Sequence, residues 1–156
     1  MTPPRPTVVC FCGSSRFIDH FGIWQWTAER EGKIALGLHW LPPSYRDALG
    51  RPAEDDHQAE AEDVAERMDE LHKRKIDLAD EVFILNVGGY VGDSTKGEIR
   101  YAIKHDKPLR WLEPESARAI LRVLHDGIAE YAPIPGLVGP DGELRAKFRE
   151  VMKDLP

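Results

Sequence analysis

Glu98 is the residue of this chain whose type and position are best suited to chemistry. It closes the run NVGGYVGDSTKGE, residues 86–98, in which an apolar segment at 82–85 leads into a glycine-rich turn. A helix-like segment follows, so we expect the carboxylate in the first turn of a helix, beside a loop whose backbone can approach a ligand closely. The same stretch carries a second carboxylate and two hydroxyls: Asp93, Ser94 and Thr95. This layout could hold a sugar or a phosphate and attack it.

The same residues also fit a structural role. Thr95 and Glu98 have the spacing of a capping box. In this motif the threonine side chain bonds the backbone amide of the glutamate, and the glutamate side chain bonds the backbone amide of the threonine. Ser94 or Asp93 could cap the helix instead. This stretch alone leaves the catalytic and the capping interpretations open.

Composition limits the classes of protein to which the chain can belong. It has 156 residues, 42% of them hydrophobic and 31% charged, which indicates one globular domain. The net charge of −6 and the lack of a basic patch argue against binding of duplex nucleic acid, although a small nucleotide remains compatible. There is no apolar stretch long enough to span a membrane and no apolar core of a signal peptide at the start, so we predict a cytoplasmic protein without membrane contact.

Cys10 and Cys12 alternate along a predicted strand and would face the same side of a sheet. A metal pair or a disulfide is conceivable there, but we favour two small buried hydrophobic residues. The six histidines show no ligand spacing such as HExxH. We therefore predict no metal site and no bound cofactor.

Strand-like and helix-like segments alternate along the chain, which predicts an α/β fold. We expect a single flavodoxin- or Rossmann-like domain with a four- or five-stranded parallel sheet and helices on both faces. The predicted strands cover residues 7–12, 33–41, 82–86 and 109–112. The predicted helices cover 17–32, 54–71, 94–105 and 115–126, and a loop covers 44–56.

The helix predicted over 54–71 is very acidic, with nine acids and one base between residues 54 and 70. We expect the acids to form its solvated face. The buried stripe is predicted to consist of Ala61, Val64, Met68 and Leu71.

Two turns are predicted to face each other across one cleft if the first and third strands are neighbours. Ligands of parallel sheets bind beyond the carboxyl ends of the strands, and the first and third strands end in turns rich in glycine and hydroxyls. Arg16 adds a positive charge to the first turn, although a serine there could also simply cap the helix. The predicted substrate-binding residues are Gly13, Ser14, Ser15, Arg16, Asn86, Gly88, Gly89, Ser94 and Thr95.

The segment after the proline- and glycine-rich run at 133–136 looks separable. We divide the chain into an α/β nucleotide-binding-like part, residues 1–132, and a tail, residues 133–156, that carries an amphipathic helix. Leu144, Phe148, Val151 and Leu155 lie three or four residues apart in it. The pattern does not say whether this helix packs on its own domain or on a partner subunit.

The middle of the chain resembles the nucleoside 2-deoxyribosyltransferase superfamily, which includes nucleoside transferases and N-glycosidases of nucleoside monophosphates. Its opening strand ends in Gly13-Ser14, Ala79-Asp80 precedes the third strand, and Glu98-Ile99 is followed by Ala102 and Lys107-Pro108. The resemblance implies that Glu98 is the nucleophile that attacks the anomeric carbon. It also implies a homodimer or larger homo-oligomer, because members of this superfamily usually build the site between subunits.

Two positions depart from the pattern of that superfamily. Members usually carry an aspartate eight residues before the position of Asp80, where this chain has His72, with Asp69 one turn earlier. Members also carry a glycine two residues after the glutamate, where this chain has Arg100. The identity of the substrate and of the proton donor therefore stays open.

The resemblance and the residues lead to one functional prediction. We expect an enzyme that cleaves the N-glycosidic bond of a nucleoside or nucleoside 5′-monophosphate through Glu98, with Asp93, Tyr90 or His72 protonating the leaving base. Arg16 and Ser94 favour a monophosphate, whereas the carboxylate of Asp93 favours a nucleoside, and we lean to the monophosphate. The alternatives are a non-catalytic nucleotide sensor that uses the same cleft and a flavin-phosphate carrier.

Overall fold

Four parallel strands form the centre of the structure, in the order β2-β1-β3-β4. The computed structural model describes residues 2–42, 44, 58–128 and 139–156. The strands are β1 (Val8–Cys12), β2 (Ile34–Leu36), β3 (Glu81–Ile84) and β4 (Leu109–Trp111). The predicted α/β fold with a parallel sheet is confirmed, with four strands among the described residues.

β1 is an inner strand of the sheet, and the candidate site described below lies at its end. All five of its residues are buried, and it pairs in parallel with β2 on one side and β3 on the other. Cys12 lies beside Ile84 in the register, so β1 and β3 end at the same level. The first and third strands are therefore neighbours, and their following turns lie at one edge of the sheet.

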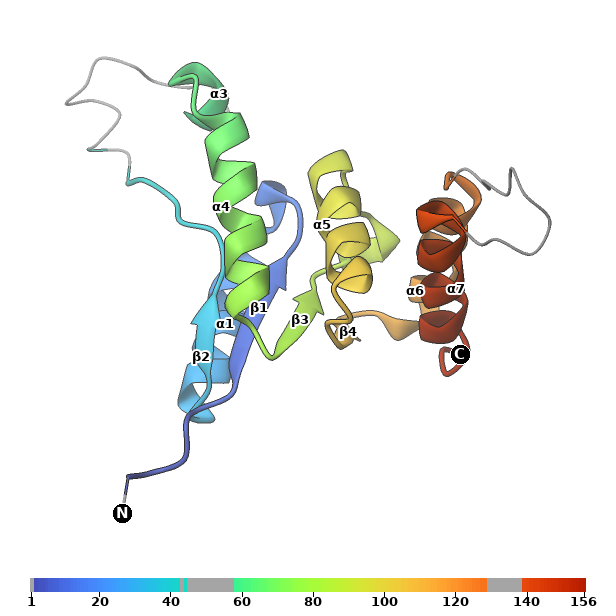
Figure 1. Ribbon diagram of the computed structural model, residues 1–156. Helices are drawn as coiled ribbons and strands as arrows, with labels where there is room; N and C mark the ends of the chain where they lie inside the picture. The colour runs from blue at the N-terminus through green and yellow to red at the C-terminus, as the bar shows by residue number, and fades with distance from the viewer. Residues whose placement is uncertain (1, 43, 45–57, 129–138) are drawn as a thin grey trace.

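The side chains of β1 alternate between two apolar layers, as the period of a strand requires. Val9 and Phe11 pack on one face with α1 (Ile18–Arg30), through Phe21 and Ala28. Cys10 and Cys12 point to the other face, so the expectation that the two cysteines share one side of the sheet is confirmed. Helices cover both faces, as predicted (Figure 1).

The second layer contains the remaining long helices, which lie over the face of the cysteines. They are α4 (Ala65–Leu78), α5 (Asp93–Lys104), α6 (Pro114–Asp126) and α7 (Pro140–Met152). α6 begins at a proline, which suits the first helical position because no hydrogen bond is lost there. Two short 3-10 turns, η1 (Ser15–Phe17) and η2 (Val87–Gly89), follow β1 and β3.

The predicted acidic helix is broken, and its predicted buried stripe is wrong. α3 (Gln58–Ala61) ends before Asp63, whose φ of 58° is left-handed, and α4 starts again at Ala65. Met68 and Leu71 are about half exposed, at 52% and 49%. The buried residues of α4 are His72 and Ile76, so the buried face is displaced by one residue from Leu71 of the predicted stripe. A one-residue shift turns a helix by about 100°, which brings a histidine rather than a leucine to the sheet.

The amphipathic C-terminal helix packs on its own chain. α7 lies against α5 and α6, and Phe148 is fully buried in the same apolar layer as Cys10 and Ile99. Leu144, Val151 and Leu155 are partly buried against that layer. The tail thus contributes directly to the core that supports the site.

Two further expectations differ from the structure or lie outside the described residues. The second strand, predicted over 33–41, is limited to the three residues of β2. The loop predicted over 44–56 lies outside the described residues except for residue 44. Among the described helices there is none that combines the length and the apolar character needed to cross a membrane.

Candidate functional site

Glu98 points into the protein and does not cap its helix. α5 begins at Asp93, after the extended residue Gly92, so Glu98 lies in the second turn rather than in the first. There is no side-chain cap hydrogen bond at this helix start, and Thr95 is itself 2% exposed. The capping-box interpretation is therefore wrong, and so is the expected position of Glu98 in the first turn.

The carboxylate of Glu98 faces a buried polar cluster. Its Oε2 lies 3.8 Å from Nε2 of His72, and the side chain of Glu98 is 12% exposed. The same Nε2 lies 3.3 Å from Sγ of Cys12 and 3.7 Å from Sγ of Cys10. We call these four residues, Cys10, Cys12, His72 and Glu98, the buried cluster. It lies where β1 ends and where α4 and α5 cross over the sheet.

Three different elements supply the cluster: β1 carries the two cysteines, α4 carries His72 and α5 carries Glu98. β1 places its two cysteines on one face because residues two apart in a strand point the same way. α4 presents His72, which is 2% exposed, one turn before Ile76 of the core. Nδ1 of His72 has no hydrogen-bond partner among the described residues. The imidazole therefore makes its polar contacts through one nitrogen, which faces both sulfurs and the carboxylate.

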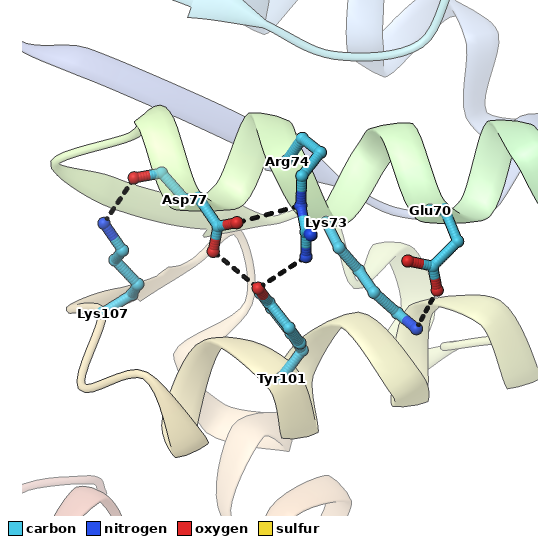
Figure 2. Close-up of polar contacts among 6 residues, drawn as sticks. All are labelled: Glu70, Lys73, Arg74, Asp77, Tyr101 and Lys107. Atoms are coloured by element: carbon cyan, nitrogen blue, oxygen red, sulfur yellow. Dashed lines mark hydrogen bonds and ion pairs between the residues drawn. The ribbon is translucent and has the colours of Figure 1, made fainter.

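A surface network holds α4 beside α5, as Figure 2 shows. Nη2 of Arg74 donates to the hydroxyl oxygen of Tyr101 at 2.8 Å, and that hydroxyl donates to Asp77 at 2.6 Å. Arg74 is also paired with Asp77 at 3.0 Å. Nζ of Lys107, which follows α5, donates to the carbonyl oxygen of Asp77 at 3.0 Å. This network fixes the spacing of the two helices that carry His72 and Glu98.

Burial governs the ionisation of Glu98. Loss of water around the carboxyl raises the pKa of Glu98 from 4.5 to about 7, although His72 opposes this shift. A position in the first turn of a helix, expected from the sequence, would have favoured the charged form, and the observed direction is the opposite. Part of the Glu98 population is therefore protonated at neutral pH.

The other groups of the cluster respond to one another. A hydrogen bond with Cys12 favours the thiolate of Cys10 and lowers its pKa to about 6, against the effect of burial. Burial raises the pKa of Cys12 well above its usual value. Burial opposes a charge on His72, but the hydrogen bond with Cys10 and the charge of Glu98 raise the net pKa of His72. The cluster thus holds one thiol that ionises readily beside one that does not.

The turns after β1 and β3 meet, as predicted. The guanidinium carbon of Arg16 lies 4.0 Å from the centre of the Tyr90 ring, and the ring of Phe17 packs on Tyr90 at 6.0 Å between centroids. Tyr90 is 40% exposed, so one aromatic side chain and one cation form an open surface at this edge of the sheet.

The glycine-rich turn after β3 is tied to the start of α6. Nδ2 of Asn86 donates to the carbonyl oxygen of Glu113 at 2.9 Å and to Oγ of Ser116 at 2.8 Å, and its Oδ1 accepts from the Glu113 amide. Both the nitrogen and the oxygen of the Asn86 side chain, which we predicted to bind substrate, therefore have partners within the protein. The amide of Gly88 donates to the carboxylate of Glu113 at 2.5 Å. A carboxylate thus occupies a backbone donor that an anionic ligand would otherwise use.

The backbone conformation at positions 88 and 89 favours glycine. Their φ angles are 62° and 75°, in the left-handed region. A Cβ on Gly13 would lie 3.1 Å from Cβ of Leu85, so a side chain there would crowd the residue that follows β3. These predicted binding glycines shape the two turns.

The remaining predicted residues lie around the helix starts. Oγ of Ser14 accepts a hydrogen bond from the Arg16 amide at 3.3 Å, which caps η1, and Ser15 begins that turn. The side chain of Asp93 is fully exposed and is paired with Lys96 at 3.8 Å. Ser94 is exposed and lies four residues before Glu98, on the same side of α5. The structure thus brings His72 to Glu98, whereas Asp93 and Tyr90 lie in or beside the exposed turn.

Sequence reasoning missed the two cysteines and Glu113 as members of the site. The alternation of Cys10 and Cys12 was a usable signal, because it placed both sulfurs on one face. Their contact with His72 could not be predicted, because it depends on the phase of α4. Nothing in the sequence around Glu113 indicated its bond to Gly88.

The ligand atoms of Cys10, Cys12 and His72 lie within 4.8 Å of one another, so these residues could hold a metal ion. Two surface hollows lie elsewhere. One of about 340 Å³ lies between α6 and α7 and is lined by the basic side chains of Arg118, Arg122, Arg149 and Lys153. The other, of about 360 Å³, lies beside β2 and includes Trp26 and Lys75. We base the site on the buried cluster, because it contains the reactive groups and these hollows do not.

Comparison of the chain with protein-family models, with curated proteins and with solved structures finds no match. The resemblance to the nucleoside 2-deoxyribosyltransferase superfamily therefore stays a prediction from the sequence.

Removing the hydroxyl of Tyr101 tests the network between α4 and α5. Tyr101→Phe is expected to lower the free energy of unfolding by about 1 kcal/mol, because the mutation removes hydrogen bonds to Asp77 and Arg74. Tyr90→Phe is the matched control, since its hydroxyl has no hydrogen-bond partner among the described residues. Equal unfolding midpoints in urea for the two variants would contradict the assigned role of Tyr101.

The ionisation of Glu98 predicts how stability depends on pH. A carboxyl with a pKa of about 7 in the folded protein and of 4.5 when unfolded stabilises the fold below pH 4.5, and this stabilisation is lost as the pH rises towards 7. The loss is on the order of 2–4 kcal/mol. Urea unfolding with a chelator present should show wild type losing stability relative to Glu98→Gln across this interval. A difference that does not change with pH would contradict the raised pKa.

Proposed function

We propose that this protein cleaves or exchanges the N-glycosidic bond of a nucleoside or nucleoside 5′-monophosphate, with the carboxylate of Glu98 as the nucleophile. The observation that supports the proposal is the orientation of Glu98. Its side chain turns away from the start of its own helix, lies at the carboxyl end of β1, and keeps 12% of its surface exposed. Ligands of parallel α/β sheets bind at this edge.

The reaction builds positive charge on the sugar as the bond to the base lengthens. The Glu98 carboxylate attacks the anomeric carbon, and the base departs with the bonding electron pair and takes up a proton. Water or a second base then attacks the same carbon, which releases Glu98 and yields either the free sugar or a new nucleoside. A buried carboxylate reacts strongly with such a centre, because few water molecules compete for its charge.

His72 is a positioning residue in this scheme. It is buried behind Glu98 and faces it through Nε2, 3.8 Å away. A protonated imidazole there favours the carboxylate form that the attack requires. The proton for the leaving base would come from the exposed turn, where Asp93 and Tyr90 lie.

The turn after β3 favours a substrate with an uncharged 5′ end. The carboxylate of Glu113 already accepts from the Gly88 amide, and the exposed carboxylate of Asp93 stands near the start of α5. Two carboxylates would repel a phosphate, whereas either could accept a hydrogen bond from a hydroxyl. Arg16, the cation expected to attract a phosphate, lies over the Tyr90 ring. We therefore place a nucleoside before the monophosphate.

A non-catalytic nucleotide sensor is the second candidate. The open surface of Arg16 and Tyr90 could stack a base without any contribution from Glu98. The two candidates differ in turnover. A sensor binds its ligand with or without the Glu98 carboxylate and releases no base.

Base release from a panel of ribo- and deoxyribonucleosides and their 5′-monophosphates tests the proposal. Wild type, assayed with a chelator and with or without an acceptor base, is expected to release free base. Glu98→Gln should lower the rate by at least about 100-fold, because it removes the nucleophile. Glu115→Gln, a change at an exposed glutamate in the first turn of α6, is the control and should react like wild type.

Two results would decide against the proposal. Release at the wild-type rate by a folded Glu98→Gln variant would show that Glu98 is not the nucleophile. Tight binding of a panel member without release would favour the sensor.

A further inference from the structure

The buried cluster contains more ligand chemistry than a nucleophile needs. Cys10 and Cys12 are fully buried and His72 is 2% exposed, yet the sulfur and nitrogen atoms of all three lie within 4.8 Å of one another. Glu98 adds a carboxylate oxygen on the side that still reaches solvent. Polar groups buried in an apolar layer cost free energy unless something satisfies them together.

The distances from the imidazole nitrogen to the other three groups match those within a tetrahedral metal centre. With zinc–sulfur bonds of about 2.3 Å and zinc–nitrogen or zinc–oxygen bonds of about 2.0 Å, the ligand atoms of such a centre lie roughly 3.3–3.8 Å apart. Nε2 of His72 lies 3.3 Å from Sγ of Cys12, 3.7 Å from Sγ of Cys10 and 3.8 Å from Oε2 of Glu98. One nitrogen thus has three potential ligand atoms at the separations that a shared cation would give.

The set of donors also indicates the kind of cation. Two thiolates and an imidazole select zinc and similar borderline-soft ions over magnesium or calcium, which prefer oxygen ligands. The two cysteines and the histidine supply three ligands, and the carboxylate of Glu98 as the fourth completes a four-coordinate site. Glu98, with its 12% exposure, marks the side from which an ion would enter.

We propose that Cys10, Cys12 and His72 bind a zinc-type divalent cation, with Glu98 as its fourth ligand. Binding releases the protons of the two thiols, because the thiolate is the form that coordinates. This inference replaces our expectation from the sequence that the chain has no metal site. It does not rest on the proposed glycosidic chemistry, but it uses the same carboxylate. A bound cation would therefore occupy the nucleophile and suppress base release.

Cobalt titration of the full chain tests this proposal. The protein is reduced, stripped with a chelator, freed from it and titrated with Co²⁺, which reports coordination through its absorption spectrum. We expect one Co²⁺ per chain, intense visible bands typical of tetrahedral cobalt, and sulfur-to-cobalt charge transfer in the near ultraviolet. Added Zn²⁺ should abolish these bands by displacing the cobalt.

Variants identify the ligands. Cys10→Ser/Cys12→Ser should abolish the charge-transfer band and weaken Zn²⁺ binding by at least about 100-fold. Glu98→Gln should keep the charge-transfer band and bind about 10-fold more weakly, because three ligands remain. His39→Gln, a change at an exposed histidine, is the control and should bind like wild type.

The wild-type spectrum decides the question even if a cysteine variant fails to fold. Failure to bind Co²⁺ at one equivalent, or pale bands without charge transfer, would overturn the proposal. Base release is measured separately with the chelator present, where the cation has no part. A chain that binds metal but releases no base would retain this proposal and refute the glycosidic one, and the reverse result would do the opposite.

Discussion

The burial of the Glu98 carboxyl is the constraint on which the rest of this site depends. A carboxylate taken out of water destabilises the fold unless partners compensate it. Here the partners are Nε2 of His72 and Sγ of Cys12, which come from a different helix and from the central strand. The register of β1 against β3 and the network of Arg74, Asp77 and Tyr101 hold those elements in place. The fold therefore keeps a reactive group where its charge is poorly solvated.

Much of this architecture could be predicted from the sequence. Apolar segments alternating with amphipathic ones predict a parallel sheet, and the turn at 86–98 marked its carboxyl edge. The choice of Glu98 as a candidate also came from its place after a glycine-rich turn, although the turn of the helix on which it lies was predicted wrongly. These inferences depend on local patterns, which a sequence displays directly.

The composition of the cluster could not be predicted, because it depends on the rotation of one helix. The acidic pattern over 54–71 predicted one continuous helix, whereas the left-handed residue Asp63 separates this stretch into two helices. α4 then presents His72 to the sheet in place of Leu71. Without that rotation the cysteines would lack the imidazole as a neighbour, and the sequence predicted them to be ordinary core residues. The start of α5 at Asp93 likewise moved Glu98 out of the capping position.

The two proposals use the same four side chains and exclude each other at any one moment. In the proposed glycosidic reaction Glu98 attacks as a free carboxylate, and His72 favours its charged form. With a divalent cation bound by the thiolates and the imidazole, the carboxylate becomes a ligand. Competition between substrate and cation would make the proposed catalysis depend on the availability of metal.

The central claim is that Glu98 forms a covalent bond to the sugar, and trapping that bond tests it most directly. A nucleoside that carries fluorine at the 2′ position should slow the second step, because fluorine destabilises the positive charge on the sugar. Intact-mass measurement of chelator-treated protein after incubation is expected to show one added fluorosugar per chain. Peptide mapping should place it on the peptide that contains Glu98. Base release from the unfluorinated nucleoside together with a fluorosugar adduct on a different residue would contradict the account.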